Sequence, residues 1–94
     1  MTEASPTQSS KRGGQLAKSE QTGNDLLATS FGRAVTHQRE LAGLSIAELA
    51  RKASMQRAYV WRVEQGTTLP NLRNAARLAL ALNIPLTALV ANLD

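Results

Sequence analysis

The stretch SIAELARKASMQRAYVWRVEQG, residues 45–66, decides the fold of this chain. It opens with Ser45 and Glu48 at the spacing of a capping box, in which the serine hydroxyl accepts from the Glu48 amide and the carboxylate reaches back. It closes with Gly66, the residue type that most readily ends a helix in the left-handed conformation. The pattern therefore predicts two short helices separated by a tight turn.

Three further helices are predicted around this pair. Phe31 and Val35 recur at near-helical spacing before Gly43, Asn71 is a natural helix cap, and Pro85 fits the first turn of a last helix. The fourth helix is expected to bury Leu72, Ala75, Ala76, Leu78, Ala79 and Leu82. The five helices are expected at about residues 30–42, 45–53, 56–65, 71–82 and 85–91. The prediction is an all-α, compact five-helix domain.

The chain divides into a polar tail and this domain. Residues 1–24 are rich in Ser, Thr, Gln and Gly and are predicted to be disordered, because they cannot bury enough apolar surface to offset the ordering entropy. Residues 25–94 form the folded unit. Lys11 and Arg12 would make a flexible basic arm, or the tail is solvated and binds nothing specifically; both interpretations stay open.

Composition excludes several kinds of chemistry. The sequence has no cysteine and a single histidine, so it offers no disulfide framework, no thiolate zinc site and no cysteine nucleophile. No serine–histidine–acid arrangement, metal-ligand spacing or glycine-rich phosphate loop is present. We expect no enzyme activity, no cofactor and no metal. The apolar runs are too short to span a membrane, which favours a cytoplasmic protein without a membrane partner.

The net charge favours a nucleic-acid partner modestly. Lys and Arg number 11 against seven Asp and Glu, a formal charge of +4. The charges of residues 1–30 cancel, so the whole excess lies in residues 31–94. Seven of the eight cations there are arginines, which suit phosphates and guanine edges better than lysines do.

Two short helices joined by a tight turn, the second presenting polar side chains, form a helix-turn-helix. The chain resembles the lambda-repressor-like, or xenobiotic-response-element (XRE), family of helix-turn-helix regulators over about residues 30–93. The resemblance is carried by Phe31-Gly32, Arg39, Gly43-Leu44-Ser45, Glu48-Leu49-Ala50, Val60, Val63-Glu64, Gly66, Pro70 and Ala81-Leu82 with Ile84. It implies a DNA-binding transcription regulator, commonly a homodimer that places helix 56–65 in the major groove of a two-fold-related operator.

The resemblance also implies the residues that contact double-stranded DNA. The base-reading residues would be Gln56, Arg57, Ala58, Trp61 and Arg62. The phosphate contacts would come from Ser45, Ile46, Tyr59, Thr67, Thr68, Asn71 and Arg73. An arginine fork suits guanine O6 and N7. For Trp61, packing beside a neighbouring helix stays an alternative, and Tyr59 is interpreted mainly as a structural residue.

In domains of this type an arginine and a glutamate at the positions of Arg39 and Glu64 pair across the helices. The alternative is two separate surface charges. Three departures from the family pattern predict weaker binding to DNA, and one of them is that threonines follow Gly66 where basic residues are frequent. Ile46 stands where glutamine is frequent, and Ser54 stands where glycine usually adopts a left-handed turn, a conformation that costs a non-glycine residue about 1 kcal/mol.

The last predicted helix carries an apolar ridge at helical spacing. Its members are Leu86, Leu89, Val90 and Leu93. Part of this ridge is expected to close the core and the rest to form a homodimer seam. The alternative function is a protein-binding adaptor or antitoxin with the same fold, in which DNA binding is secondary. A bacterial or phage repressor, a restriction–modification controller, an antitoxin and a host regulator are all compatible with the sequence.

Overall fold

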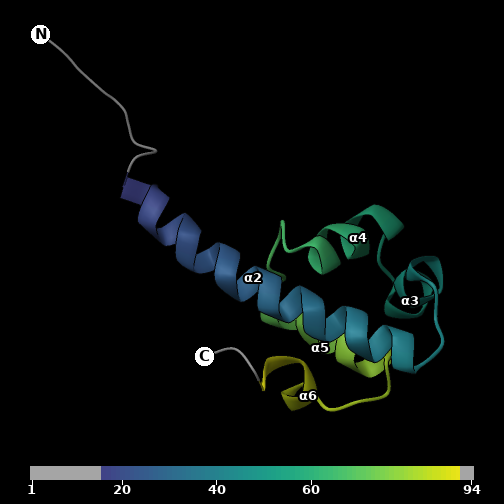
Figure 1. Cartoon of the computed structure of the whole chain (residues 1–94). Coiled ribbons are helices and arrows are strands. Elements are labelled where there is room, and N and C mark those ends of the chain that lie inside the picture. Colours follow the sequence, from purple (N-terminus) through teal and green to yellow (C-terminus); the bar gives the residue numbers. More distant parts are fainter. Residues whose placement is uncertain (1–15, 92–94) are drawn as a thin grey trace, which may run out of the picture.

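Helix α2 is the longest element of the computed structural model, which describes residues 16–91 and, within them, the side chains from residue 26 onward. It spans Leu16–Leu41 and is followed by α3 (Ile46–Ala53), α4 (Arg57–Gln65), α5 (Leu72–Ala81) and α6 (Thr87–Val90) (Figure 1). These residues contain five helices and no strand. The predicted all-α, five-helix fold is confirmed.

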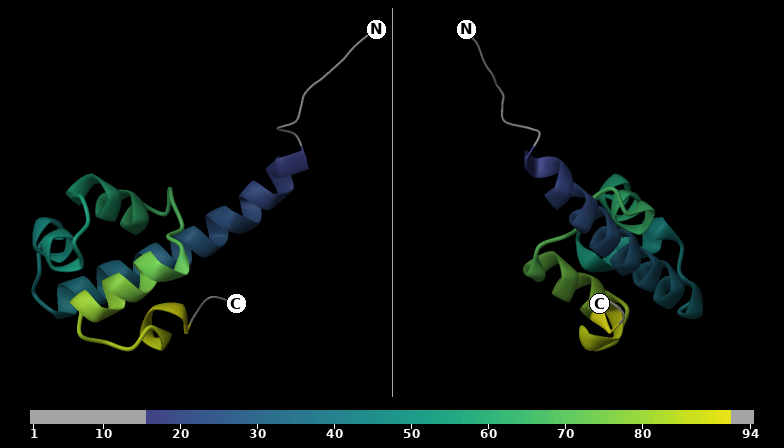
Figure 2. Two further views of the ribbon diagram at one scale, coloured as in Figure 1. Left: turned by 180° about the vertical axis from the view of Figure 1, so that it is seen from behind. Right: turned by 60° about the vertical axis from the view of Figure 1, so that its left-hand side comes forward.

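The expected start of the first helix, near residue 30, is wrong. Helix α2 begins at Leu16 and includes residues 16–24, which the sequence assigned to a disordered tail. The polar composition of this segment, rich in Ser, Thr, Gln and Gly, was the reason to predict disorder. A nucleated helix nevertheless gains one backbone hydrogen bond with each added residue. Figures 1 and 2 show this end of α2 extending beyond the other helices, and the rest of the tail, residues 1–15, lies outside the described residues.

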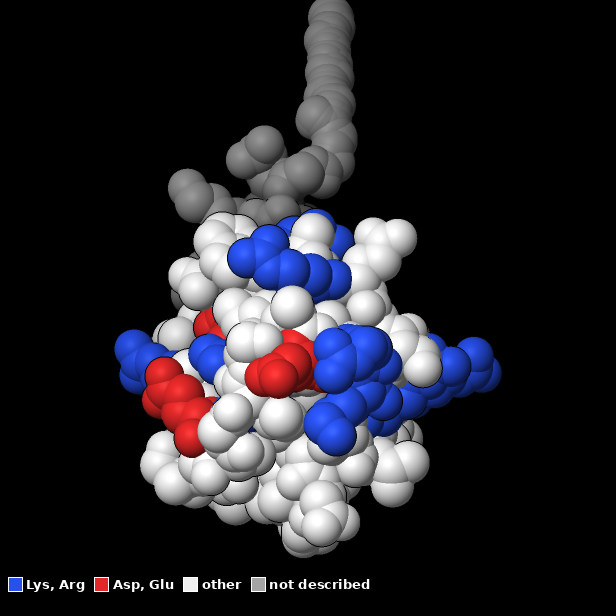
Figure 3. Space-filling model, turned by 90° about the vertical axis from the view of Figure 1, so that its right-hand side faces the viewer, with Lys and Arg blue, Asp and Glu red and all other residues white. Residues whose placement is uncertain are grey.

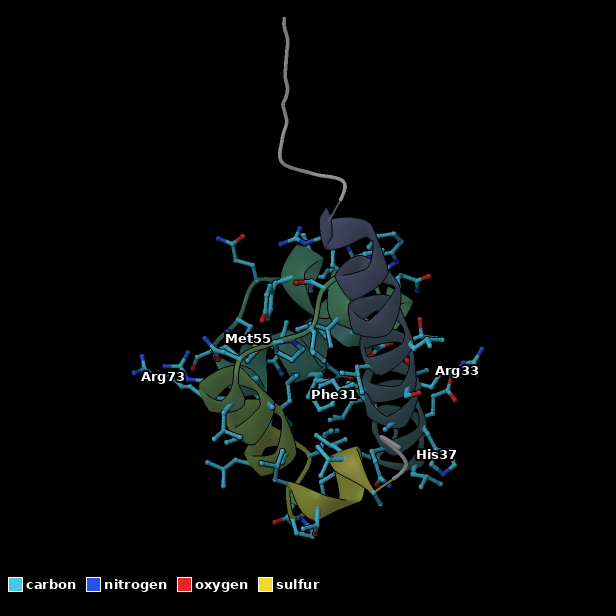
Figure 4. All side chains as sticks on the ribbon, turned by 90° about the vertical axis from the view of Figure 1, so that its left-hand side faces the viewer. Phe31, Arg33, His37, Met55 and Arg73 are labelled. Carbon is cyan, nitrogen blue, oxygen red and sulfur yellow. The ribbon has the colours of Figure 1, made fainter. Side chains whose placement is uncertain are left out.

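The core lies where the helices meet. Helix α2 packs against α4 and α6, and α3 packs against α4 and α5 (Figure 2). Phe31 points from α2 into the space between the helices (Figure 4). The largest fully buried side chains are Phe31, Val35, Leu49, Val60, Val63, Leu78 and Leu89. Every described helix thus contributes to one core. No helix in residues 16–91 combines the length and apolarity needed to cross a membrane.

The helix ends follow the local sequence closely. The Glu48 amide donates to Ser45 Oγ at 3.0 Å and the Ser45 amide donates to Glu48 Oε1 at 2.8 Å, so the predicted capping box is confirmed. Gly66 ends α4 in the left-handed region at φ 78°. Ser54 adopts the same region at φ 59° in the turn between α3 and α4, as expected for the position where the family has glycine.

Three apolar residues lie elsewhere than expected. Leu72 and Ala76 of α5 are exposed rather than buried, because α5 turns only the arc with Ala75, Leu78 and Ala79 toward the core. Leu89, expected in the dimer seam, is 0% exposed and fills the core under α6, so it cannot form a surface seam. Leu86 is partly buried and Val90 is exposed. Leu93 lies outside the described residues.

Candidate nucleic-acid interface

Helix α4 has buried side chains on one face and exposed side chains on the other. Val60 and Val63 have no exposed surface and face the core. The side chains predicted to read bases, Gln56, Arg57, Ala58, Trp61 and Arg62, are all exposed. Trp61 is 49% exposed, so its indole does not lie in the core. The structure therefore brings the five predicted base-reading residues onto one accessible side of α4 and its N-cap.

An ion pair holds the C-terminal end of α4. Arg39 Nε donates to Glu64 Oε2 at 2.7 Å and Nη2 donates to Oε1 at 3.1 Å, while Nη1 donates to the Leu44 carbonyl at 2.8 Å. The Glu64 side chain is 3% exposed and that of Arg39 is 15% exposed. The hydrogen bond to Glu64 raises the pKa of Arg39, so the guanidinium stays charged. The pair expected from the sequence is present in its bidentate form.

Gly32 lets α2 approach α4 closely. A Cβ at this position would lie 2.3 Å from the Val63 carbonyl oxygen and 2.7 Å from that of Glu64. Both obstacles are backbone atoms, so no side chain can move aside to make room. In the sequence, Gly32 belonged to the family resemblance but had no assigned role. Its place beside the Arg39–Glu64 pair shows that it fixes the distance between α2 and α4.

Tyr59 connects α4 to α5 and supports Arg62. Asn74 Nδ2 donates to the Tyr59 hydroxyl at 3.1 Å. Arg62 Cζ lies 5.9 Å from the centre of the Tyr59 ring, within the range of a cation–π interaction. Sequence reasoning missed Asn74. The only local signal was its place three residues after the cap residue Asn71, which indicates a helix and not a contact with α4.

The N-terminus of α3 presents backbone amides that have no partner within the helix. The first intrahelical bond of α3 runs from the Leu49 amide to the Ser45 carbonyl at 3.0 Å, so the amides of Ile46 and Ala47 precede it. Such amides and the positive end of the helix dipole attract anions. The Ile46 side chain packs against the core, which leaves its backbone amide as the group suited to a phosphate.

The residues after α4 that are predicted to contact phosphates differ in whether they have a free hydrogen-bond donor. Thr67 donates both its amide and its hydroxyl hydrogen to the Arg62 carbonyl, at 3.0 and 3.1 Å, so a phosphate contact there would require a bond to break. Asn71 Oδ1 accepts from the Asn74 amide at 2.8 Å, which leaves its Nδ2 as the donor. Thr68 is partly buried. Arg73 is exposed and projects outward from α5 (Figure 4).

Comparison with known proteins identifies the family. Residues 30–93 match the family model described as a helix-turn-helix domain. The chain belongs to this helix-turn-helix family. It is similar to the restriction-modification controller protein C.AhdI from Aeromonas hydrophila, with 35% identity and a TM-score of 0.65 over 66% of this chain and 94% of that chain. No curated protein matches the sequence.

The resemblance to lambda-repressor-like regulators is therefore confirmed, and the protein is a DNA-binding transcription regulator of the helix-turn-helix type. Its family and fold point away from an enzyme. Positive side chains dominate the end of the regulator formed by α3 and α4. Figure 3 shows Lys and Arg over the upper and right-hand parts of this face and also at its left edge, with Asp and Glu toward the middle and left. The exposed cations on these two helices are Arg51, Lys52, Arg57 and Arg62.

Proposed function

We propose that the regulator binds double-stranded DNA in a sequence-specific manner as a homodimer, with α4 in the major groove of a two-fold-related operator. The observation that supports this most directly is the pair of faces of α4. Glu64 is held inward by Arg39 while Arg57 and Arg62 are exposed on the outer side. A helix supported in this way presents fixed side chains to base edges, which is how helix-turn-helix proteins read sequence.

Within this proposal the side chains of α4 have separate roles. Arg57, in the first turn, and Arg62 would each form a bidentate contact with a guanine, while Ala58 would admit close approach or touch a thymine methyl group. Arg62 is already placed over the Tyr59 ring, which reduces the freedom it loses on binding. Trp61 would lie against sugar or thymine methyl groups.

Phosphate contacts would flank α4 on both sides. On one side, the amides of Ile46 and Ala47 at the start of α3 would bind a phosphate, since the Ser45 amide already donates to Glu48. On the other, the Asn71 amide group and Arg73 would contact the opposite edge of the groove. Such contacts position the domain and carry no sequence information.

The homodimer would form through α6 and its surroundings. Val90 is exposed and Leu86 partly exposed there, whereas Leu89 belongs to the core. A two-fold dimer on adjacent half-sites would space the two copies of α4 about 34 Å apart. The similarity to a restriction-modification controller supports transcription control over the adaptor or antitoxin alternative.

Selection of bound sequences from a random double-stranded DNA pool tests the proposal. We expect a two-fold-related consensus and an affinity that falls steeply with salt. Arg57→Ala should then lose about 1–3 kcal/mol of discrimination at one base pair. Arg33→Ala removes the same charge from the outer side of α2 and should leave base preference unchanged. Weak binding without a consensus would instead favour the adaptor alternative.

A further inference from the structure

Helix α5 carries an exposed apolar ridge that the fold does not use. Leu72 is 73% exposed and Leu80 is 81% exposed, and Ala76 between them is also exposed. Because these residues follow one another at intervals of four, they form one ridge about 12 Å long. The small side chain of Ala76 at its centre leaves room for a helix to lie across it. Exposed apolar residues arranged contiguously usually mark an interaction surface.

The ridge runs into a hollow between α5 and the C-terminal end of α3. The hollow has a volume of about 280 Å³ and is lined by Lys52, Ala53, Ser54, Arg77, Leu80 and Ala81. Leu80 belongs to both the ridge and the hollow. A ligand in the hollow would therefore meet apolar surface from Leu80 and the two alanines. It would also meet two cations, Lys52 of α3 and Arg77 of α5.

The charges around the ridge have one sign. Helix α5 carries Arg73 and Arg77, and the sequence has no Asp or Glu from residue 65 to residue 93. A second copy docked on this face would bring arginine against arginine. A DNA phosphate would meet the exposed Leu80 side chain in place of a donor. A segment that presents both apolar side chains and carboxylates satisfies every group on this surface.

We infer that the ridge of Leu72, Ala76 and Leu80, with the adjoining α3–α5 hollow, binds an acidic amphipathic helix of another protein. An aliphatic side chain of that helix enters the hollow against Leu80, and its carboxylates pair with Lys52 and Arg77. The geometry is that of an amphipathic helix laid in a groove. No residue lining the hollow belongs to α4, so a partner bound there leaves the base-reading residues of α4 uncovered.

The test is an NMR titration of the full chain, labelled with nitrogen-15. The probe is a synthetic amphipathic helical peptide with leucines at helical spacing and flanking glutamates, and the matched control has glutamine at every glutamate. We expect shift changes confined to α5 and the end of α3, and about tenfold weaker binding of the glutamine peptide. Absence of binding, equal binding of both peptides, or shifts centred on α4 or α6 would overturn the inference.

Variants on the surface separate the alternative occupants. Lys52→Gln combined with Arg77→Gln, and separately Leu80→Ser, should each weaken the acidic peptide about tenfold, while Arg33→Gln should not. All of these side chains are exposed, so the fold should persist, which the melting temperature checks. If the double variant weakens DNA binding as much as Arg57→Ala does, the surface is a phosphate contact and the inference fails. If Leu80→Ser converts a dimer to a monomer, the occupant is a second copy and the inference also fails.

Discussion

The inner face of α4 is held by buried contacts with α2, whereas its outer face is exposed to solvent. On the inner face, Glu64 receives two hydrogen bonds from Arg39, and the backbone of α4 lies against Gly32 with no space for another atom. On the outer face, Arg57 and Arg62 are exposed, and the described interaction of Arg62 is with the Tyr59 ring of the same helix. The inner face fixes where the helix lies, whereas the outer face can change without affecting the fold. Substitutions on the two faces should therefore separate stability from recognition.

The largest effect is expected from breaking the ion pair. Arg39→Ala and Glu64→Ala should each lower the free energy of unfolding by about 3–5 kcal/mol, because the remaining charge is left buried without its partner. The double variant should cost much less than the sum of the two. Urea unfolding measures all three, with Arg57→Ala as the outer-face control that keeps wild-type stability. Additive losses would show that the two residues act separately.

The next effect is expected from filling the α2–α4 contact. Gly32→Ala should lower the free energy of unfolding by about 1–3 kcal/mol, since its methyl group meets two carbonyl oxygens and the helices must move apart. Arg33→Ala, one residue along and pointing away from the core, should change stability by no more than about 0.5 kcal/mol. Thermal or urea unfolding compares the two. Equal, small effects would contradict the close approach.

A gain in stability is expected in the turn that joins the two helices of the motif. Ser54→Gly should raise the free energy of unfolding by about 0.5–1 kcal/mol, because glycine adopts the left-handed conformation without strain. Ser54→Ala keeps a Cβ and should show no such gain. The gain in stability should come without a change in DNA recognition, since Ser54 lies in the turn before α4 and not on the outer face of that helix. A loss of stability in the glycine variant would mean that the serine side chain itself matters there.

The smallest effect is expected at the cap of α3. Hydrogen bonding with Ser45 lowers the pKa of Glu48, and the backbone amide of Ser45 contributes more than its side chain. A carboxylate whose pKa is lowered on folding contributes stability above its ordinary pKa, and this is lost as the pH falls through the folded value. The wild-type advantage over Glu48→Gln should thus shrink between pH 7 and about pH 3. Urea midpoints across that range measure it, and a constant difference would argue against the cap.

Local chemistry explains which parts of the fold the sequence predicted well. The capping box, the end of α4 at Gly66 and the left-handed turn at Ser54 depend on residues within one or two turns of each other. The partners Arg39 and Glu64 are far apart in the chain, and only the family resemblance brought them together. Neither periodicity nor spacing identifies a contact between two separate helices.

The predictions that failed have other causes. Leu72 was expected inside because a period of 3.6 finds apolar residues but does not show how wide an arc its neighbours cover. Leu89 was expected in the seam for the same reason, although α6 turns it fully into the core. The bond between Asn74 and the Tyr59 hydroxyl depends on how α5 packs beside α4, which no local pattern encodes. The start of α2 was missed because propagation carried the helix through weak formers.

Trp61 gives the regulator a built-in optical reporter. It is the only tryptophan in the sequence, and about half of its surface meets water. Indole emission responds to the polarity around the ring and to stacked aromatic groups, so a nucleobase or deoxyribose arriving beside α4 would alter the spectrum directly. A titration of the unlabelled protein with DNA would then follow complex formation through the intrinsic fluorescence of Trp61.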